Sequence, residues 1–208
     1  MIPSRLVLAT TSTGKLAELA ELVAEWGPVA CVALADVAGV PAVDETAPTY
    51  AGNAIAKARA VAGASGLPAL ADDSGLEVDA LGGAPGVRSA RWAGAGVRDA
   101  ERSARLLAAL EGTPEGARTA RFRCVVALAW PDGRVATAEG VCQGRIALAP
   151  QGSEGFGYDP IFVSDDLGRT FGEASAAEKR RVGFRSRAVR ALGAKLRRLA
   201  LRGAGSPC

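Results

Sequence analysis

The chain contains no histidine among its 208 residues. Acid-base chemistry and metal ligation by imidazole are therefore excluded, and any catalysis depends on carboxylates, lysines or water. The four cysteines, at positions 31, 124, 142 and 208, include no closely spaced pair. This spacing argues against a zinc cluster and against the disulfide framework of a small secreted protein.

Long apolar runs are also missing, although 49% of the residues are hydrophobic. No run approaches the roughly 20 residues that a membrane-spanning helix needs, and residues 1–26 lack the order of a signal peptide. We therefore expect a cytoplasmic protein without a membrane partner. The length and the 23% charged content predict a single domain over residues 1–202, which could have two lobes, and a flexible tail over residues 203–208.

Charge is unevenly distributed, because residues 178–208 hold ten basic residues and one acidic residue. Their net charge of +9 exceeds the +3 of the whole chain, so the preceding part is acidic. Helically spaced apolar residues at 189, 192, 196, 199 and 200 favour a helix with one buried stripe and a solvated basic face. Nucleic-acid binding by the whole patch, or phosphate binding by a few of its members, is the alternative interpretation.

Hydrophobic patterning predicts strands alternating with helices. Expected strands cover residues 5–9, 31–34, 67–71, 121–130 and 134–143, and the last two are joined by a Pro-Asp-Gly hairpin turn. Expected helices cover 15–25, 49–64 and a segment from Asp99, as a candidate cap, to Leu110. Residues 82–96, rich in Gly and Ala, are expected to form an ordered loop or lid. The pattern indicates an α/β protein with a mixed sheet.

Two adjacent carboxylates, Asp72 and Asp73, end the apolar run of residues 67–71 and precede a Ser-Gly pair that predicts a turn. Carboxylates beside apolar surface are costly unless a cation neutralises them. A hard divalent metal ion is the expected cation.

A turn rich in hydroxyl groups, Thr10-Thr11-Ser12-Thr13-Gly14-Lys15, separates the first expected strand from the first helix. Backbone N–H groups and the helix dipole favour an anion there. A lysine in the first turn opposes the helix dipole unless an anion lies between them, which favours phosphate binding over a simple helix cap. The segment is not a P-loop, because Ala9 and Leu16 occupy positions where that motif needs Gly and Ser or Thr.

A second candidate cluster, residues 152–160, places Phe156, Gly157, Tyr158 and Asp159 among glycines. Glycines allow a ligand to approach the backbone, and an aromatic ring offers a stacking surface for a base. A turn with packed aromatic side chains is the alternative.

These motifs occur together with Asp-Asp-Ser-Gly-Leu-Glu-Val-Asp-Ala-Leu, Gly-Ala-Pro-Gly-Val, Ser-Ala-Arg-Trp-Ala-Gly, Gly-Phe-Gly-Tyr-Asp-Pro-Ile-Phe, and a Glu-Lys pair six residues before Arg185. In this order, from residue 6 to about residue 192, they resemble the inosine triphosphate pyrophosphatase family. The resemblance implies hydrolysis of dITP, ITP or XTP to the monophosphate and pyrophosphate. It also implies an elongated mixed sheet flanked by helices, two lobes around a nucleotide cleft, a homodimer and Mg²⁺ as cofactor.

The resemblance also implies roles for individual residues. Asp73 matches the general base and a metal ligand, and Glu45 matches a second metal ligand. The matching substrate contacts are Thr10, Thr11, Ser12, Thr13, Gly14, Lys15, Lys57, Ser74, Phe156, Gly157, Tyr158, Asp159, Lys179, Phe184 and Arg185. Side chains alternate between the two faces of a strand, so Asp72 is expected on the face opposite Asp73, in a supporting role.

Two positions depart from the family pattern. Gly183-Phe184-Arg185 stands where relatives usually have Ser-His-Arg, and Gly52 stands where they often have Glu. Phe184 cannot donate a side-chain hydrogen bond to the purine, which affects substrate preference more than reaction type. The alternatives are a related pyrophosphatase for modified pyrimidine triphosphates, or a non-catalytic protein that binds nucleotides or nucleic acid. The leading hypothesis predicts no stable nucleic-acid partner.

Overall fold

The computed structural model describes residues 1–94 and 96–204. Its chain forms two compact units. The first comprises Met1–Asp73, Cys124–Gly140 and Arg185–Cys208, and the second comprises Ser74–Arg123 and Val141–Phe184. Gly203 and Ala204, which belong to the predicted tail, are the last residues of a helix, and 205–208 lie outside the described residues.

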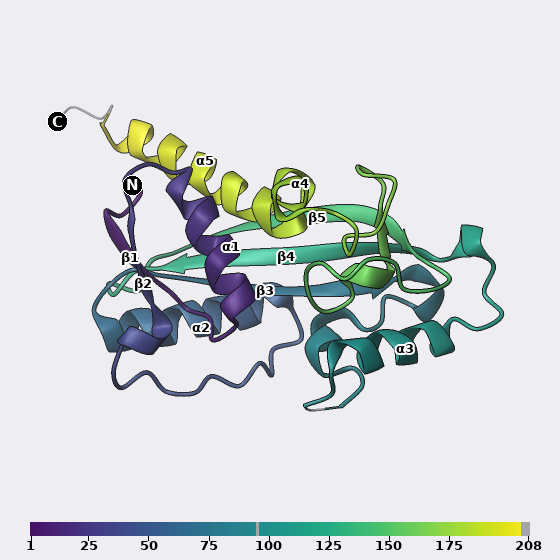
Figure 1. The fold of residues 1–208 in the computed structure, drawn as a ribbon. Helices are drawn as coiled ribbons and strands as arrows, with labels where there is room; N and C mark the ends of the chain where they lie inside the picture. Colours follow the sequence, from purple (N-terminus) through teal and green to yellow (C-terminus); the bar gives the residue numbers. More distant parts are fainter. Residues whose placement is uncertain (95, 205–208) are drawn as a thin grey trace. The chain divides into compact units, whose positions relative to one another are not determined.

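Six strands form one sheet (Figure 1). The prediction of a mixed sheet is confirmed, but its sixth strand was not predicted. Its order is β2-β1-β3-β4-β5-β6. β1 pairs in parallel with β2 and with β3, whereas β5 and β6 are antiparallel. The strands are β1 (Arg5–Leu8), β2 (Ala30–Ala33), β3 (Ala69–Val78), β4 (Thr119–Ala129), β5 (Val135–Ile146) and β6 (Phe162–Ser164).

Five α-helices and five 3₁₀ turns accompany the sheet in the described part of the chain. The helices are α1 (Thr13–Ala24), α2 (Tyr50–Ser65), α3 (Asp99–Ala109), α4 (Ala176–Val182) and α5 (Phe184–Ala204). The 3₁₀ turns are η1 (Leu34–Asp36), η2 (Asp79–Leu81), η3 (Gly86–Arg91), η4 (Glu115–Ala117) and η5 (Asp159–Ile161). Among the described residues, no helix has the length and apolar character that crossing a membrane requires.

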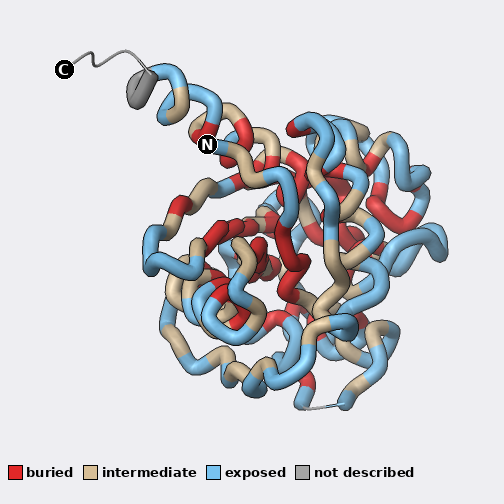
Figure 2. Tube along the Cα trace, turned by 90° about the vertical axis from the view of Figure 1, so that its left-hand side faces the viewer, coloured by how far each residue is buried: buried red, intermediate tan, exposed pale blue. Residues whose placement is uncertain are grey.

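The core of the first unit lies between its strands and the helices α1, α2 and α5. Figure 1 shows α5 along one side of the strands and α2 along the other. Val189, Leu192 and Leu196 form the buried stripe of α5, but Leu199 is 50% exposed, so the predicted stripe is one turn too long. Figure 2 shows the same change, from buried to exposed residues, toward the end of α5.

The core of the second unit is aromatic. Phe122, Phe162, Phe171 and Phe184 form one cluster, in which the Phe122 and Phe184 rings stack with centroids 4.6 Å apart. Each of the four side chains is at least nine-tenths buried. Such ring pairs stabilise a core beyond the area they bury.

Two local predictions were wrong. The Ser74-Gly75 pair does not break the strand after Asp73, because β3 continues to Val78. Sheet pairing therefore overrides the local turn preference of Ser-Gly. Asp99 is the first residue of α3 and Arg98 is its N-cap, and the Asp99 carboxylate binds other groups instead.

Candidate functional site

The strand register brings the hydroxyl-rich turn next to the two carboxylates. In the parallel pair β1 and β3, Leu8 lies opposite Leu70. The two strands run in the same direction, so the turn after β1 and Asp72 and Asp73 on β3 lie at the same end of this pair. Ser12 caps α1 and accepts a hydrogen bond from the Lys15 amide, while residues 11–14 are exposed. The N-terminus of α1 is therefore open to an anion.

Asp72 is buried at the centre of a charge network in the first unit. Its carboxylate lies 3.1 Å from Lys15 Nζ and accepts a hydrogen bond from Arg185 Nε at 3.0 Å. Arg185, only 1% exposed, also donates to Glu18 at 2.5 Å. Burial raises the pKa of Asp72, but the charges of Lys15 and Arg185 outweigh it and hold this pKa far below its ordinary value. Asp72 therefore stays ionised and fixes Lys15 beside the turn.

Asp73 has a different environment from Asp72, as strand alternation predicts. Asn53 on α2 donates a hydrogen bond to Asp73 Oδ2 at 2.9 Å. Burial raises the pKa of Asp73, and the hydrogen bond from Asn53 and the charge of Lys57 oppose this rise. Glu45 raises the pKa further, which means that the two carboxylates act on each other electrostatically. A carboxylate with a raised pKa is better suited to accept a proton than an ordinary one.

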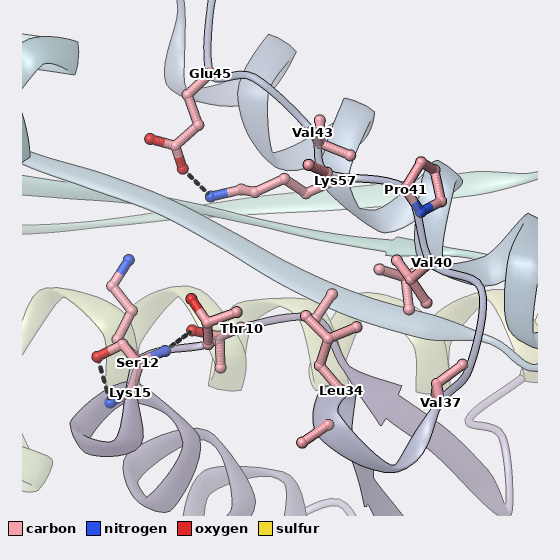
Figure 3. A pocket seen from close by; sticks show the side chains of 15 residues that line it. Thr10, Ser12, Lys15, Leu34, Val37, Val40, Pro41, Val43, Glu45 and Lys57 are labelled. Carbon is pink, nitrogen blue, oxygen red and sulfur yellow. Dashed lines mark hydrogen bonds and ion pairs between the residues drawn. The ribbon is translucent and has the colours of Figure 1, made fainter.

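Glu45 and Lys57 form an ion pair next to Asp73. Lys57 Nζ lies 2.5 Å from Glu45 Oε1 (Figure 3). Within the described chain no cluster of three or more candidate metal-ligating side chains occurs. Mg²⁺, however, usually takes only one or two protein carboxylates and completes its shell with water and substrate phosphates. Glu45 and Asp73, two carboxylates that interact electrostatically, fit that requirement.

Lys15, Glu45 and Lys57 line a cavity of about 610 Å³ in the first unit, and Asp73 is not part of its lining. Its polar lining comes from the turn, Lys15, Glu45 and Lys57. The remainder is apolar and comes from the residue after β1, from η1 and the segment that follows it, and from α2. These residues are Ala9, Leu34, Ala35, Val37, Val40, Pro41, Ala42, Val43 and Val61. In Figure 3, Lys15 and Glu45 lie toward one end of the cavity, and Leu34, Val37 and Val40 toward the other. One end therefore suits phosphate groups, and the other suits an apolar group.

In the second unit, Phe156 offers the exposed aromatic face that the sequence predicted for this cluster. Its side chain is 36% exposed, and Lys179 Nζ lies 4.7 Å from the ring centroid. Tyr158 is 3% exposed, and its hydroxyl donates to the Ser89 carbonyl at 3.1 Å. Tyr158 therefore packs inside the unit, and Phe156 is the ring of this pair that a base could cover.

Asp159 organises this second cluster. Its carboxylate accepts hydrogen bonds from the Phe156 amide, at 2.8 Å, and from Lys179. Gly155 has a φ of +78°, and a Cβ there would lie 2.1 Å from Asp159 Oδ2. Glycine at position 155 is therefore required for the carboxylate to reach its partners. Asp159 holds Lys179 and Phe156 in fixed positions relative to each other.

Phe184 and Gly183, the first departure from the family pattern, have structural explanations. Phe184 is 4% exposed and belongs to the aromatic cluster. A Cβ at Gly183 would lie 2.6 Å from the Lys179 carbonyl oxygen, so the serine that relatives carry would require a shift at the end of α4. Gly183 and Phe184 thus stand where the family pattern has two polar residues, and Phe184 packs in the aromatic cluster.

Gly52, the second departure, lies close to the segment before α2. A Cβ there would be 2.7 Å from Ala47 Cβ, so a glutamate would displace that segment. The backbone of Ala47 is in turn held by Asn53, whose side-chain oxygen accepts its N–H at 2.9 Å. The small residue is therefore matched to the local path of the chain that carries Glu45.

The remaining predicted site residues have mixed surroundings. Ser74 on β3 is half-buried, and the guanidinium of Arg185 is enclosed by Asp72 and Glu18. Several basic side chains of α5 bind within the first unit: Arg190 pairs with Glu25, and Arg197 donates to the Glu25 carbonyl. These contacts favour the interpretation of the basic segment as a helix docked on its own unit.

Sequence reasoning missed Asn53, Glu18 and Asp99. Asn53 could have been found, because it precedes Lys57 by four residues and so lies on the same face of α2. Asp99 accepts a hydrogen bond from the Gly157 amide at 2.7 Å, and Glu18 pairs with Arg185. Nothing local in the sequence points to these contacts, because the partners are distant in the chain; Asp99 stood out only as a candidate helix cap.

Comparisons with known proteins identify the family of the chain. A dITP/XTP pyrophosphatase from Desulforamulus reducens is 50% identical over 89% of this chain and 92% of its own length. A dITP/XTP pyrophosphatase from Streptomyces avermitilis is 46% identical over 91% of this chain and 95% of its own length.

Two solved structures of similar proteins also match most of this chain. A HAM1 protein from Coxiella burnetii superposes with a TM-score of 0.84 at 41% identity, over 94% of this chain and all of that one. A nucleoside-triphosphatase, or dITP/XTP pyrophosphatase, from Mycobacterium abscessus has a TM-score of 0.74 at 43% identity, over 92% of this chain and 98% of its own. The Ham1 family model matches residues 6–195. The resemblance that the motifs indicated is thus confirmed, and the chain belongs to the Ham1 family.

Proposed function

We propose that this protein hydrolyses non-canonical purine nucleoside triphosphates, namely dITP, ITP and XTP, to the monophosphate and pyrophosphate. The observation that carries the proposal is the arrangement of Asp73 beside Lys57, Lys15 and an open helix N-terminus. The names of the relatives that match most of the chain support this substrate class. Removal of these nucleotides keeps them from polymerases.

Binding of the triphosphate falls to the turn after β1 and to the two lysines of the cavity. Amide and hydroxyl groups of residues 10–14 donate hydrogen bonds to phosphate oxygens, and Lys15 and Lys57 neutralise their charge. Because Asp72 forms an ion pair with Lys15, the ammonium of Lys15 is held in place before substrate arrives. Such preorganised charge stabilises the pyrophosphate leaving group as the bond breaks.

Asp73 is the proposed general base. It takes a proton from the attacking water, whose oxygen forms a bond to the α-phosphorus while the bond from this phosphorus to the α–β bridging oxygen breaks. Asn53 orients the carboxylate by donating to Oδ2, and burial gives it a raised pKa. The negative charge that develops on the leaving group is taken up by Lys15 and Lys57.

Mg²⁺ is the proposed cofactor, with Asp73 and Glu45 as its protein ligands. When bound, it would supply charge neutralisation on the triphosphate and polarise the attacking water. The two carboxylates match the small number of protein ligands that Mg²⁺ usually takes when substrate phosphates complete its shell.

The base is assigned to the cluster of the second unit. Phe156 gives an exposed stacking face, and Lys179, held by Asp159, gives a cation beside it. Ser74, Gly157 and Arg185 remain proposed contacts by resemblance. The side chains of Tyr158 and Phe184, which the resemblance also implied, are buried in the second unit and are proposed to support the site from within it. The proposal includes a homodimer in the cytoplasm, and light scattering coupled to size-exclusion chromatography measures the dimer directly.

The test is a panel of ITP, XTP, GTP, ATP and their deoxy forms, assayed with Mg²⁺ for pyrophosphate and for orthophosphate. We expect pyrophosphate from ITP, dITP and XTP at the highest kcat/KM, and loss of most turnover in Asp73→Asn. The matched control is Asp132→Asn, an exposed carboxylate in the hairpin turn between β4 and β5. Release of single orthophosphates instead of pyrophosphate overturns the proposal, as does full activity of Asp73→Asn.

A further inference from the structure

The cavity of the first unit has an apolar end that the triphosphate does not need. Leu34, Val37 and Val40 line it, and all three side chains are half-buried. Phosphate groups are strongly hydrated and gain nothing from apolar walls, whereas an apolar group gains free energy when it covers them. The lining therefore fits a ligand that has phosphates at one end and an apolar group at the other.

The charged side chains near Asp73 determine which way such a ligand lies in the cavity. Lys57, Glu45 and Lys15 all act electrostatically on Asp73, so the polar end of the cavity is the one near the proposed site of attack. The labelled apolar residues Leu34, Val37 and Val40 lie toward the opposite end (Figure 3). Phe156, the proposed contact of the base, is not among the residues that line this cavity. The base joins the nucleotide on the side of the α-phosphate, so the group that reaches the apolar end is attached to the other end of the chain of phosphates, at the terminal phosphate.

The chemistry of the reaction permits such an attachment. Water bonds to the α-phosphorus, the bond to the α–β bridging oxygen breaks, and everything beyond that oxygen leaves together. A substituent on the terminal phosphate departs with the pyrophosphate and touches neither the attacking water nor the bond that breaks. An enzyme that releases terminal orthophosphate would not have this tolerance.

We propose that the apolar end of this cavity is a subsite for an aromatic or other apolar group esterified to the terminal phosphate of a purine nucleoside triphosphate. The subsite rests on the proposed function, because that function sets the position of the α-phosphate. The substrate class is thereby extended to nucleotides with an apolar ester at the terminal phosphate, and the products are the nucleoside monophosphate and a pyrophosphate monoester.

The test compares two esters of ITP, one with phenyl and one with methyl on the terminal phosphate. Both carry the same charge, so their ratio of kcat/KM isolates the apolar contact. We expect the wild type to favour the phenyl ester about tenfold, in keeping with the burial of one ring face. Mass spectrometry should identify IMP and phenyl pyrophosphate as the products.

The variant Val37→Thr/Val40→Thr keeps the shape of both side chains and places hydroxyl groups against the ring. It should lower the phenyl-to-methyl ratio about tenfold, because burying hydroxyl groups against an apolar group is costly. Its kcat/KM for ITP should stay within about twofold of the wild type. Val135→Thr on β5, which does not line the cavity, is the matched control and should leave every ratio unchanged.

The failures of the two proposals are distinguishable. Hydrolysis of ITP with no preference for the phenyl ester overturns the subsite and leaves the proposed function intact. Phenyl phosphate as a product, or equal losses for both esters in the double variant, also overturns the subsite. Failure to hydrolyse ITP itself overturns both. Circular dichroism and thermal melting confirm that each variant is folded.

Discussion

The carboxylate of Asp72 lies 3.1 Å from the ammonium of Lys15, and this pair joins the start of α1 to the middle of the sheet. The same carboxylate accepts a hydrogen bond from Arg185 on α5. Asp72 and Arg185 are both 1% exposed, so neither charge can be satisfied by water if its partner is lost. Asp72 therefore acts as a positioning residue and a structural residue at once.

Replacement of Asp72 by Asn should separate these two roles. We expect a loss of about 3–5 kcal/mol in the free energy of unfolding, because the Arg185 charge stays buried without its full counter-charge. In the protein that remains folded, KM for ITP should rise more than kcat falls, because Lys15 is no longer held. Chemical denaturation and steady-state kinetics measure the two effects.

Lys15→Ala is the control for Asp72→Asn, since it should raise KM similarly with a smaller loss of stability. In this variant Asp72 keeps Arg185 as a buried counter-charge, and the Lys15 side chain that is removed is itself 22% exposed. An unchanged KM in both variants would show that the pair has no part in substrate binding.

Phe184→His tests the departure from the family pattern at the base site. Phe184 is 4% exposed and stacks on Phe122, so an imidazole there stays inside the aromatic cluster. We expect an unchanged ratio of ITP to GTP turnover and a loss of about 1–3 kcal/mol in stability from the buried polar ring. A competitive pyrophosphate-release assay on both nucleotides measures the ratio.

Phe184→Leu is the matched apolar variant, and it should also leave the ratio unchanged. If the histidine variant alone gains preference for ITP, then the side chain at position 184 reaches the base, contrary to its burial in the cluster.

Most of the fold was predictable from local patterns. The apolar segment at residues 5–9 and the helical spacing of Leu16, Leu19 and Leu22 gave β1 and α1 to within two residues at each end. The end of β3 was not predictable, because pairing within the sheet keeps Ser74 and Gly75 extended. Strand alternation correctly predicted different surroundings for Asp72 and Asp73.

The candidate site was predictable only in part. The turn at 10–15 and the carboxylates stand out locally, because each follows an apolar strand. The enclosure of Arg185 could not be foreseen, since its partner Asp72 is 113 residues away in the sequence. The role of Phe184 depends likewise on rings that come together only in the folded second unit.

Gly193 and Gly63 should respond in opposite ways to replacement by alanine. A Cβ at Gly193 on α5 would lie 2.6 Å from Trp26 Nε1, whose N–H donates to the Val189 carbonyl. We expect Gly193→Ala to destabilise the protein by about 1–3 kcal/mol through overpacking. Gly63 on α2 has nothing within 4 Å of such a Cβ, and Gly63→Ala should stabilise by up to about 1 kcal/mol.

Urea denaturation of both variants measures these changes, and the opposite signs make each the control for the other. Stabilisation by Gly193→Ala would mean that Trp26 does not pack against α5 as described.

Glu178 should make stability depend on pH in the acid range. Its carboxylate binds the Ser175 side chain and amide in a capping box and pairs with Arg169, and these contacts lower its pKa from 4.5 to about 2. The folded pKa is depressed, so the stabilisation is complete above the unfolded value. It is lost as pH falls from about 4.5 toward about 2.

Denaturation midpoints of the wild type and Glu178→Gln measure this effect. The wild type should be the more stable at pH 7, and the difference should shrink between pH 5 and pH 2. Asp132→Asn is the control, because Asp132 caps no helix. This variant should change the pH dependence of stability less than Glu178→Gln does. A difference that stays constant with pH would contradict the assignment.

Lys57 lies where it can take the place of a metal ion on Glu45. Its ammonium is 2.5 Å from Glu45 Oε1 and also acts on Asp73, so one cation faces both proposed metal ligands. A divalent ion that binds the free protein must compete with this charge. When a triphosphate is present, its oxygens offer Lys57 another partner, and the carboxylates become available.

Lys57→Met should therefore raise the affinity of the nucleotide-free protein for Mn²⁺ by at least about tenfold, because two carboxylates lose a nearby positive charge. Isothermal titration calorimetry with Mn²⁺ alone measures this without any turnover. The same variant should raise KM for ITP, because a phosphate contact is lost. Lys57→Arg keeps the charge and should leave the Mn²⁺ affinity close to the wild-type value. If Lys57→Met bound Mn²⁺ no better than the wild type, Glu45 and Asp73 would not be the metal ligands that Lys57 shields.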